Sequence, residues 1–128
     1  MSKLRVWWMP QVGIGQTFYI PVETIEGGKK IMDILAAYDL FQLQNNVKLD
    51  YVNAGGLEMW DEEEKEWIDW RIETEDDFFE DIDEYCEQCD KAEELEEFER
   101  KLFEQIDWEK VKKREKHCLN REYTKEVL

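Results

Sequence analysis

Two segments near the N-terminus alternate in a way that is typical of β-strands. Leu4–Met9 alternates and ends before a proline, and Thr17–Val22 places Phe18, Ile20 and Val22 on one face. A period of two residues matches the pleat of a strand. The segment between them contains two glycines, which favour a turn. The pattern therefore predicts an antiparallel hairpin.

A helical pattern follows the first hairpin. Ile31, Leu35, Tyr38 and Phe41 recur at intervals of four, three and three residues, so they share one face of an amphipathic helix. Thr24 is a suitable N-cap, and an Asn-Asn pair after the last apolar position is a plausible helix end. We expect the shared apolar face to pack on the sheet.

A second hairpin is expected in the middle of the chain. Tyr51–Asn53 and Leu57–Trp60 read as short strands on either side of Ala54–Gly56. The acidic turn Asp61–Lys65 then leads to Trp67–Ile72, which alternates again.

The chain from Asp76 onward contains neither glycine nor proline, and its apolar residues have helical spacing. The residues with this spacing are Ile82, Tyr85, Cys89, Ala92, Leu95, Phe98, Leu102 and Ile106. Asp107 is a candidate cap for a last helix that carries Val111, Cys118 and Leu119.

Together these elements predict an α+β fold. We expect a small antiparallel sheet of two hairpins with one packed helix, followed by acidic C-terminal helices. The length of 128 residues suits a single domain, 1–128, with an α+β core over 1–75 and a helical part over 76–128.

The composition indicates a folded but very acidic protein. The net charge is −16, which by itself favours disorder, but 13% of the residues are aromatic, and disordered chains lack such side chains. This balance excludes collagen, a disulfide miniprotein and a protein that binds nucleic acid directly through bulk positive charge.

The negative charge is concentrated in one segment. Residues 58–100 contain 22 acidic and four basic residues, whereas residues 1–57 are neutral overall and residues 101–128 are slightly basic. A field of this size either keeps the protein soluble or attracts a basic partner. Carboxylates along a helix can also imitate the phosphates of nucleic acid, so the basic groove of a nucleic-acid-binding protein is one candidate partner surface.

Tryptophans near the acidic segment are candidate anchors for such a partner. Trp7 and Trp8 are adjacent on a strand and must point to opposite faces of the sheet, and the same holds for Trp67 and Trp70. Either the C-terminal helices cover the second face, or it is an aromatic binding surface. The predicted partner-binding residues are Trp60, Trp67, Trp70, Glu80, Asp81, Asp83 and Glu84.

Catalysis is not expected, and we predict neither catalytic residues nor a cofactor. The one histidine lies next to a cysteine and has no convincing triad partners, and the glycine pairs lack the context of a phosphate loop.

A zinc-stabilised module is one alternative. Cys86 and Cys89 form a C-x-x-C pair, and His117 with Cys118 could complete a ligand set. The adjacent pair has poor spacing for zinc, however, and free thiols at a helix seam explain the cysteines as well. We therefore expect no bound metal and no disulfide.

A nucleotide-like ligand is the other alternative. The Gly55-Gly56 backbone could form the floor of a pocket beside a tryptophan, and an anionic ligand would need nearby bases. The candidate residues are Arg5, Tyr51, Asn53, Gly55, Gly56 and Arg71, with Lys3 and Lys48 as further bases.

Neither a membrane-spanning segment nor a signal peptide is expected. The apolar runs are short or carry charge, and Met1-Ser2-Lys3 is followed by a strand pattern. With an odd number of cysteines and no export signal, the sequence favours reduced thiols in a cytoplasm.

Several strings in the first 72 residues resemble a known family. They are LRVWWMPQV from Leu4, ILAAYDLFQ from Ile34, the Asn45-Asn46 and Asp50-Tyr51 pairs, NAGGLE from Asn53 and WIDW from Trp67. The chain is similar in these strings to small phage-encoded accessory proteins that are labelled superinfection exclusion proteins. The resemblance implies a role in conflict between phages or between phage and host, inside an infected host cell, and it implies no catalytic residues. We expect a non-enzymatic protein that binds and inhibits a host or phage factor, in a counter-defence or exclusion role.

Overall fold

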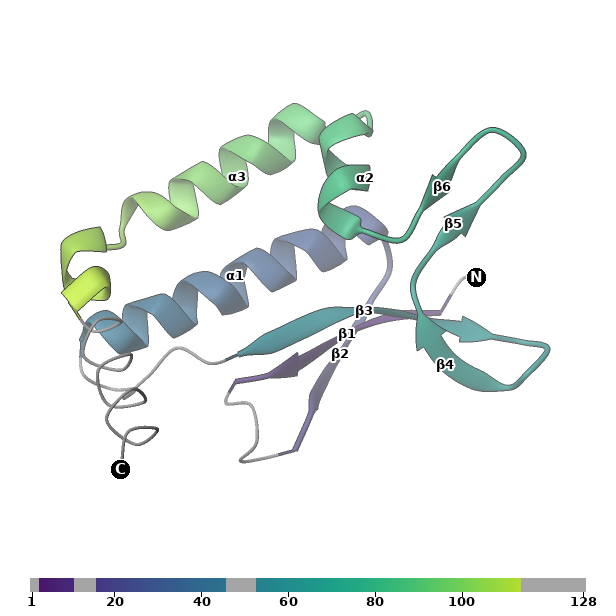
Figure 1. The fold of residues 1–128 in the computed structure, drawn as a ribbon, viewed down its shortest axis with the longest axis horizontal. Coiled ribbons are helices and arrows are strands. Elements are labelled where there is room, and N and C mark those ends of the chain that lie inside the picture. The colour runs from purple at the N-terminus through teal and green to yellow at the C-terminus, as the bar shows by residue number, and fades with distance from the viewer. Residues whose placement is uncertain (1–2, 11–15, 46–52, 114–128) are drawn as a thin grey trace, which may run out of the picture.

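The fold was analysed in a computed structural model that describes residues 3–10, 16–45 and 53–113 (Figure 1). The elements in chain order are β1 (Leu4–Met9), β2 (Phe18–Val22), α1 (Ile25–Gln44), β3 (Ala54–Asp61), β4 (Glu66–Asp69), β5 (Ile72–Glu73), β6 (Phe78–Phe79), α2 (Ile82–Gln88) and α3 (Ala92–Glu104). Residues 108–113 are also helical. The predicted α+β class is confirmed.

The main sheet is antiparallel, with the strand order β2-β1-β3-β4. The first predicted hairpin, β1–β2, and the second, β3–β4, are both present, and β1 joins them by pairing with β3. Pro21 lies on the edge strand β2, where a proline is tolerated because its missing N–H faces away from β1.

Figure 1 shows the helices on one side of this sheet. Helix α1 lies along the sheet, and α3 runs beside α1 on the side away from the strands. The C-terminal helices therefore pack on α1 and do not cover the second face of the sheet, within the part of the chain that the structure describes.

Helix α1 begins where the sequence predicts, but its buried face differs from the prediction. The Thr24 hydroxyl accepts a hydrogen bond from Gly27 N at 2.9 Å. Tyr38 and Phe41 are 57% and 41% exposed. The prediction that these two rings face the core is wrong because α1 is enclosed on two flanks, by the sheet and by α2 and α3. The residues buried instead are Gly28, Lys29, Asp33, Ala37, Asp39, Leu40 and Leu43.

Two hydrophobic clusters hold the layers together. The first joins Leu4, Val6, Leu57 and Trp70 under the N-terminal half of α1. The second joins Leu40 and Leu43 of α1 to Ile106 and Val111, beyond the end of α3. The buried carboxylate of Asp39 adds a polar tie, because its Oδ2 accepts hydrogen bonds from Trp8 Nε1 at 3.2 Å and Asn53 Nδ2 at 2.7 Å.

The middle of the chain departs from the predicted pattern in two places. Ala54, Gly55 and Gly56 do not interrupt two strands but lie inside the continuous strand β3. Phe78 and Phe79 form β6, which pairs with β5 in a small third hairpin where a helix was expected. Tyr51 and the predicted strand start before Asn53 lie outside the described residues.

Gly55 and Gly56 are required by the tryptophans of β1. A Cβ on Gly55 would lie 2.1 Å from Cε3 of Trp8, and one on Gly56 would lie 2.6 Å from Nε1 of Trp7. The two indoles therefore cover β3 from opposite faces, which only residues without side chains permit.

Two leucines of α3 should contribute differently to stability because they are buried to different extents. Leu95 is fully buried, whereas Leu102 is half-exposed. We expect Leu95→Ala to lower the free energy of unfolding by about 2–5 kcal/mol, and Leu102→Ala to cost clearly less, because a half-exposed site leaves a smaller cavity. Urea denaturation of both variants measures the difference, and equal losses would show that α3 is not docked as described.

Candidate functional site

The outer face of the sheet, opposite α1, is rich in aromatic and charged side chains. The strand register places Arg5 and Trp7 of β1 on this face with Tyr19 of β2, Glu58 and Trp60 of β3, and Trp67 of β4. This set, here called the outer aromatic face, is not covered by any helix of the described residues. The sequence left open whether helices cover the second face of the sheet or whether that face is an aromatic surface. The positions of Trp7, Trp60 and Trp67 agree with an aromatic surface.

Arg5 lies at the centre of the outer aromatic face. Its guanidinium carbon is 3.8 Å from the ring centroid of Tyr19 and 4.2 Å from that of Trp67. Its Nε donates a hydrogen bond of 2.8 Å to Glu58 Oε1. Cation–π contacts on both faces of the guanidinium and the ion pair together fix these rings across β2, β1 and β4.

Trp60 and Trp67 form an edge-to-face pair next to the turn of the β3–β4 hairpin. Their ring centroids are 5.5 Å apart at an interplanar angle of 72°, and Lys3 Nζ lies 5.3 Å from the Trp60 centroid. Both indoles are half-buried. They are therefore held in place by neighbours while part of each ring stays accessible.

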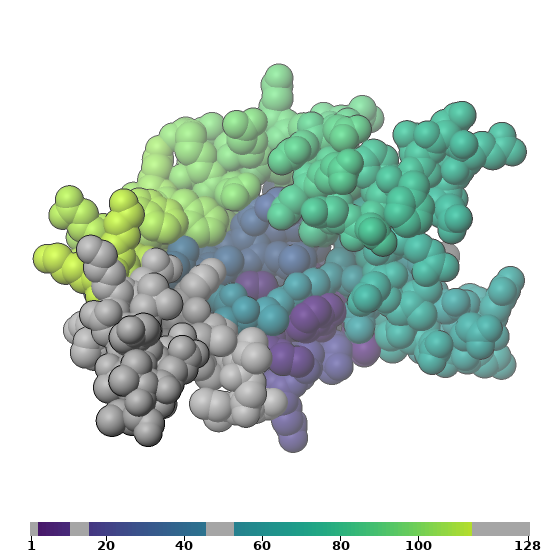
Figure 2. All heavy atoms as spheres, viewed as in Figure 1, coloured from purple at the N-terminus to yellow at the C-terminus, as the bar shows by residue number. Residues whose placement is uncertain are grey.

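The acidic turn, Asp61–Lys65, directly follows Trp60 in the chain. Asp61 Oδ1 accepts hydrogen bonds from the backbone N–H groups of Glu63 at 2.9 Å and Glu64 at 3.2 Å, and Lys65 has a φ of 55°. Asp61 thus shapes the turn, and the side chains of Glu62, Glu63 and Glu64 are exposed. Figure 2 shows the β3–β4 and β5–β6 hairpins as two projections at the same end of the molecule.

Trp70 is not a surface anchor. It is 5% exposed and belongs to the first hydrophobic cluster, where its ring contacts Tyr85 edge-to-face at 5.6 Å. Trp70 lies on the face opposite Trp67, as the alternation predicts, but that inner face is packed in the core, so its ring is not accessible to a partner.

The four predicted acidic residues near α2 divide into two groups. Asp81 is the N-cap of α2, and its Oδ1 accepts hydrogen bonds from Asp83 N at 2.9 Å and Glu84 N at 3.4 Å. Asp83 pairs with Lys29 Nζ at 3.1 Å. Glu80 and Glu84 are exposed and remain candidates for partner contact. The role of Asp81 has a signal in the sequence, because an Asp followed three residues later by Glu is a capping pattern.

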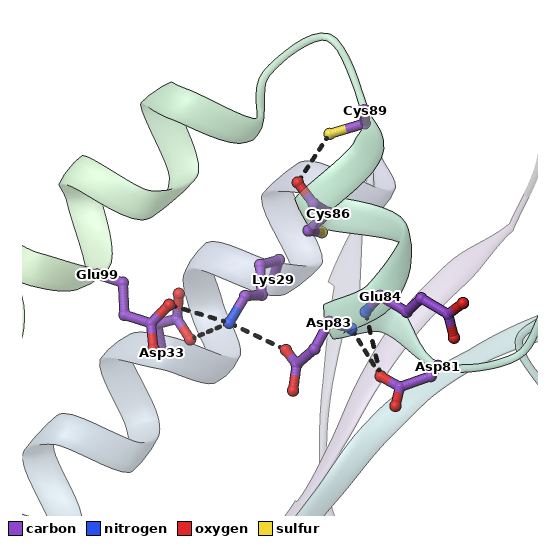
Figure 3. A network of polar contacts seen from close by, with 8 residues as sticks. All are labelled: Lys29, Asp33, Asp81, Asp83, Glu84, Cys86, Cys89 and Glu99. Atoms are coloured by element: carbon purple, nitrogen blue, oxygen red, sulfur yellow. Dashed lines mark hydrogen bonds and ion pairs between the residues drawn. The ribbon is translucent and has the colours of Figure 1, made fainter.

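Lys29 connects three helices, as Figure 3 shows. Its Nζ lies 2.7 Å from Asp33 Oδ1, 3.1 Å from Asp83 Oδ1 and 3.6 Å from Glu99 Oε2. Burial opposes the ammonium charge, but the hydrogen bond and charge of Asp33, reinforced by Asp83, raise the pKa of Lys29. Burial outweighs the bond from Lys29 and raises the pKa of Asp33. The network is a structural joint, and sequence reasoning missed it.

The structure brings together only some of the predicted ligand residues that it describes. Arg5 lies on the outer aromatic face, Asn53 binds Asp39, and Tyr51 and Lys48 lie outside the described residues. Gly55, Gly56 and Arg71 do line one cavity of about 620 Å³ beside Trp7 and Trp70. Asp69, Glu80, Asp81 and Asp83 line it too, and this negative charge disfavours an anionic ligand.

The cysteines are free thiols where the structure describes them. Cys86 is buried in α2, and Cys89 is the C-cap of that helix, so the pair spans a helix end rather than lying inside one long helix. Within residues 3–10, 16–45 and 53–113, no cluster of three potential metal ligands is found. His117 and Cys118 lie outside this part of the chain, so the four-ligand zinc set stays an alternative that the described residues do not test.

Comparison with known proteins shows where the chain belongs. The family described as "Superinfection exclusion gene product 17" matches residues 3–91. The chain is also 43% identical, over 96 residues, to the "Superinfection exclusion protein" of Salmonella phage P22. That alignment covers 66% of this chain and 90% of the P22 protein. The chain is a member of the superinfection exclusion gene product 17 family.

The family match extends beyond the strings that carried the sequence resemblance. It includes the whole sheet, the β5–β6 hairpin and α2, and it ends just before α3. Both the outer aromatic face and the acidic turn lie inside it. No solved structure matches the chain significantly. Among the described helices, none combines the length and the apolar character needed to cross a bilayer.

Asp81 and Glu80 should differ in their effect on stability, although they are adjacent acids. Asp81→Ala removes a helix cap and is expected to lower the free energy of unfolding by about 0.5–2 kcal/mol. Glu80→Ala changes an exposed side chain and should stay within about 0.5 kcal/mol of the parent. Thermal or urea denaturation distinguishes them. A cost at Glu80 that equals the cost at Asp81 would contradict the assigned cap.

The two described cysteines should also differ in reactivity. Burial, and then the neighbouring Cys89, raises the pKa of the Cys86 thiol to about 12. A raised pKa leaves almost no thiolate at pH 8, and the thiolate is the reactive form. Iodoacetamide should therefore modify the half-exposed Cys89 well before Cys86 in the folded protein. Peptide mapping by mass spectrometry measures the order, and faster modification of Cys86 would contradict the burial described for α2.

Proposed function

We propose that this protein contributes to superinfection exclusion by binding and inhibiting a basic protein factor of the host or of a competing phage. The single observation that carries the proposal is the position of the half-buried Trp60–Trp67 pair, which lies on an uncovered sheet face and adjoins the exposed acidic turn. The family membership supports the biological setting. The mechanism is binding and needs no catalytic step.

The aromatic pair supplies what an interface anchor needs. Tryptophan is enriched among the residues that dominate binding energy, and such residues act best when neighbours already hold them in position. Arg5 on one side and the Trp60 edge on the other restrict the Trp67 ring before any partner arrives. Contact with a partner would thus cost little side-chain entropy.

The acidic residues supply the choice of partner. Glu62, Glu63 and Glu64 are exposed. Residues 58–100 contain 22 acidic and only four basic residues, and two of these bases already lie near carboxylates, since Arg100 pairs with Glu97 and Glu104 and Arg71 lies 3.9 Å from Glu73. The field of residues 58–100 is therefore not cancelled locally. It favours a basic surface, such as the nucleic-acid-binding face of a host defence protein.

The proposal can be tested by charge reversal at the acidic turn. Host cells expressing the intact chain are challenged with phage, and the same protein is used to recover its partner for kinetic measurement. Glu63→Lys with Glu64→Lys should slow association by at least about tenfold at low salt, because exposed charges steer encounter, and should weaken exclusion. Glu23→Lys with Glu109→Lys makes the same charge change at exposed positions away from the turn and is the matched control.

The aromatic anchor has a different expected signature. Trp67→Ala should mainly speed dissociation and should also weaken exclusion, because loss of an anchor acts on the lifetime of a complex. Unfolding curves for every variant confirm that the sheet is intact. If exclusion and binding are indifferent to salt, to the lysine pair and to Trp67, the negative charge serves solubility and the proposal fails.

A further inference from the structure

The cavity beside β3 adjoins an unpaired stretch of strand. Strand β4 pairs with β3 only over Glu58–Asp61, and the chain then turns away at Trp70 into the β5–β6 hairpin. The N-terminal part of β3, from Ala54 to Leu57, thus has β1 on one side. On the other side, within the described residues, its one backbone hydrogen bond is that from Trp70 N to Leu57 O, at 3.0 Å.

The register identifies which backbone groups face this open edge. Trp60 N donates to Lys3 O, so Trp60 and every second residue before it direct their backbone groups toward β1. Gly55 lies on the alternate set, together with Leu57. Its N–H and C=O therefore face the edge, where no described residue pairs with them. A row of unpaired groups on a strand is a template for another strand.

The lining of the cavity next to this edge is suited to a basic ligand. Its volume is about 620 Å³, and the Trp7 and Trp70 indoles form part of its wall. Four carboxylates line it, from Asp69, Glu80, Asp81 and Asp83, against one base, Arg71. Asp69 and Glu80 are exposed and have no ion pair within the described residues, so their charge is available to a ligand.

From these observations we infer that an extended, basic peptide segment of the partner binds here by strand addition to Gly55. Its backbone pairs with the N–H and C=O of Gly55, and a cationic side chain enters the cavity against Trp7 and the carboxylates of Asp69 and Glu80. This inference rests on the proposed function for the basic character of the partner, and it adds the form in which that partner is recognised.

The glycine pair makes this edge unusually accessible. Because Gly55 has no side chain and Trp8 and Trp7 cover the strand from above and below, the open edge is the direction from which another backbone can approach. Charge complementarity then selects a basic segment over a neutral or acidic one.

The experiment uses the intact protein and a defined probe, acetyl-Val-Arg-Val-Arg-Val-amide. Binding is followed by NMR chemical shifts, and amide exchange is measured at Gly55. We expect the exchange of the Gly55 amide to slow at least about fivefold on binding, because a new hydrogen bond protects it. Replacing both arginines by citrulline, which keeps the shape and removes the charge, should weaken binding about tenfold.

Backbone methylation of the probe tests the strand pairing itself. One probe is N-methylated at its valines and another at its arginines. Alternate amides of a bound strand face opposite ways, so one methylated probe should lose at least about fivefold in affinity and the other should bind nearly as well as the parent. Equal behaviour of the two methylated probes, or an unchanged Gly55 amide, would overturn strand addition.

Protein variants test the cavity without disturbing its glycine. Asp69→Asn with Glu80→Gln should weaken the probe about three- to tenfold. Asp76→Asn with Glu75→Gln makes the same charge change at the exposed β5–β6 turn and should have little effect. Equal effects of the two pairs would show that the probe responds only to the overall negative charge and not to the cavity, which would contradict the inference.

The outcomes separate this inference from the proposed function. If the two methylated probes bind equally, or the Gly55 amide stays unchanged, while the acidic-turn variants still lose exclusion, strand addition at Gly55 is rejected and the proposed function stands. If the free protein is a dimer by sedimentation, with the Gly55 amide already protected, a second copy occupies the edge and the inference is likewise overturned.

Discussion

The fold depends on the contact of two adjacent tryptophans with two adjacent glycines. Trp7 and Trp8 must leave β1 on opposite faces, and each indole lies across β3 where a side chain would collide with it. Trp8 on the inner face also donates to the buried Asp39, which ties α1 and Asn53 to the sheet. Trp7 on the outer face becomes a wall of the cavity. One pair of residues thus sets both the packing of the core and the shape of the exposed surface.

The acidic character of the chain is compatible with this fold because of where the charges lie. Most of the described carboxylates are exposed to solvent, among them those of the hairpin turns and of α3. The buried carboxylate of Asp33 shares the ammonium of Lys29 with Asp83 and Glu99, and this network draws α1, α2 and α3 together. A buried ion network of this kind is a weak source of net stability, but removing one member would leave an uncompensated charge. The network therefore determines the relative positions of the three helices more than it contributes to the free energy of unfolding.

Local patterns predicted the elements whose contacts lie close in sequence. The alternation of β1 and β2 and the cap at Thr24 were sufficient for those elements. The buried face of α1 could not be predicted, because the second flank is covered by α3, more than fifty residues later. The placement of Gly55 inside a strand depends in the same way on Trp8. At the candidate site, Trp60 and Trp67 followed from alternation, whereas Trp70 and Asp83 have roles that come from distant partners, Tyr85 and Lys29.

Because of the proline in β2, the two edges of the sheet differ in their ability to pair with another strand. A fibre can grow by strand pairing only if each molecule pairs through one sheet edge with the preceding molecule and through the other edge with the next. Pro21 has no N–H to offer at the β2 edge, so a neighbouring strand would lose a rung of the ladder there. An addition at the β3 edge would accordingly end after one step. The molecule can therefore combine an accessible backbone edge on β3 with resistance to strand-to-strand polymerisation.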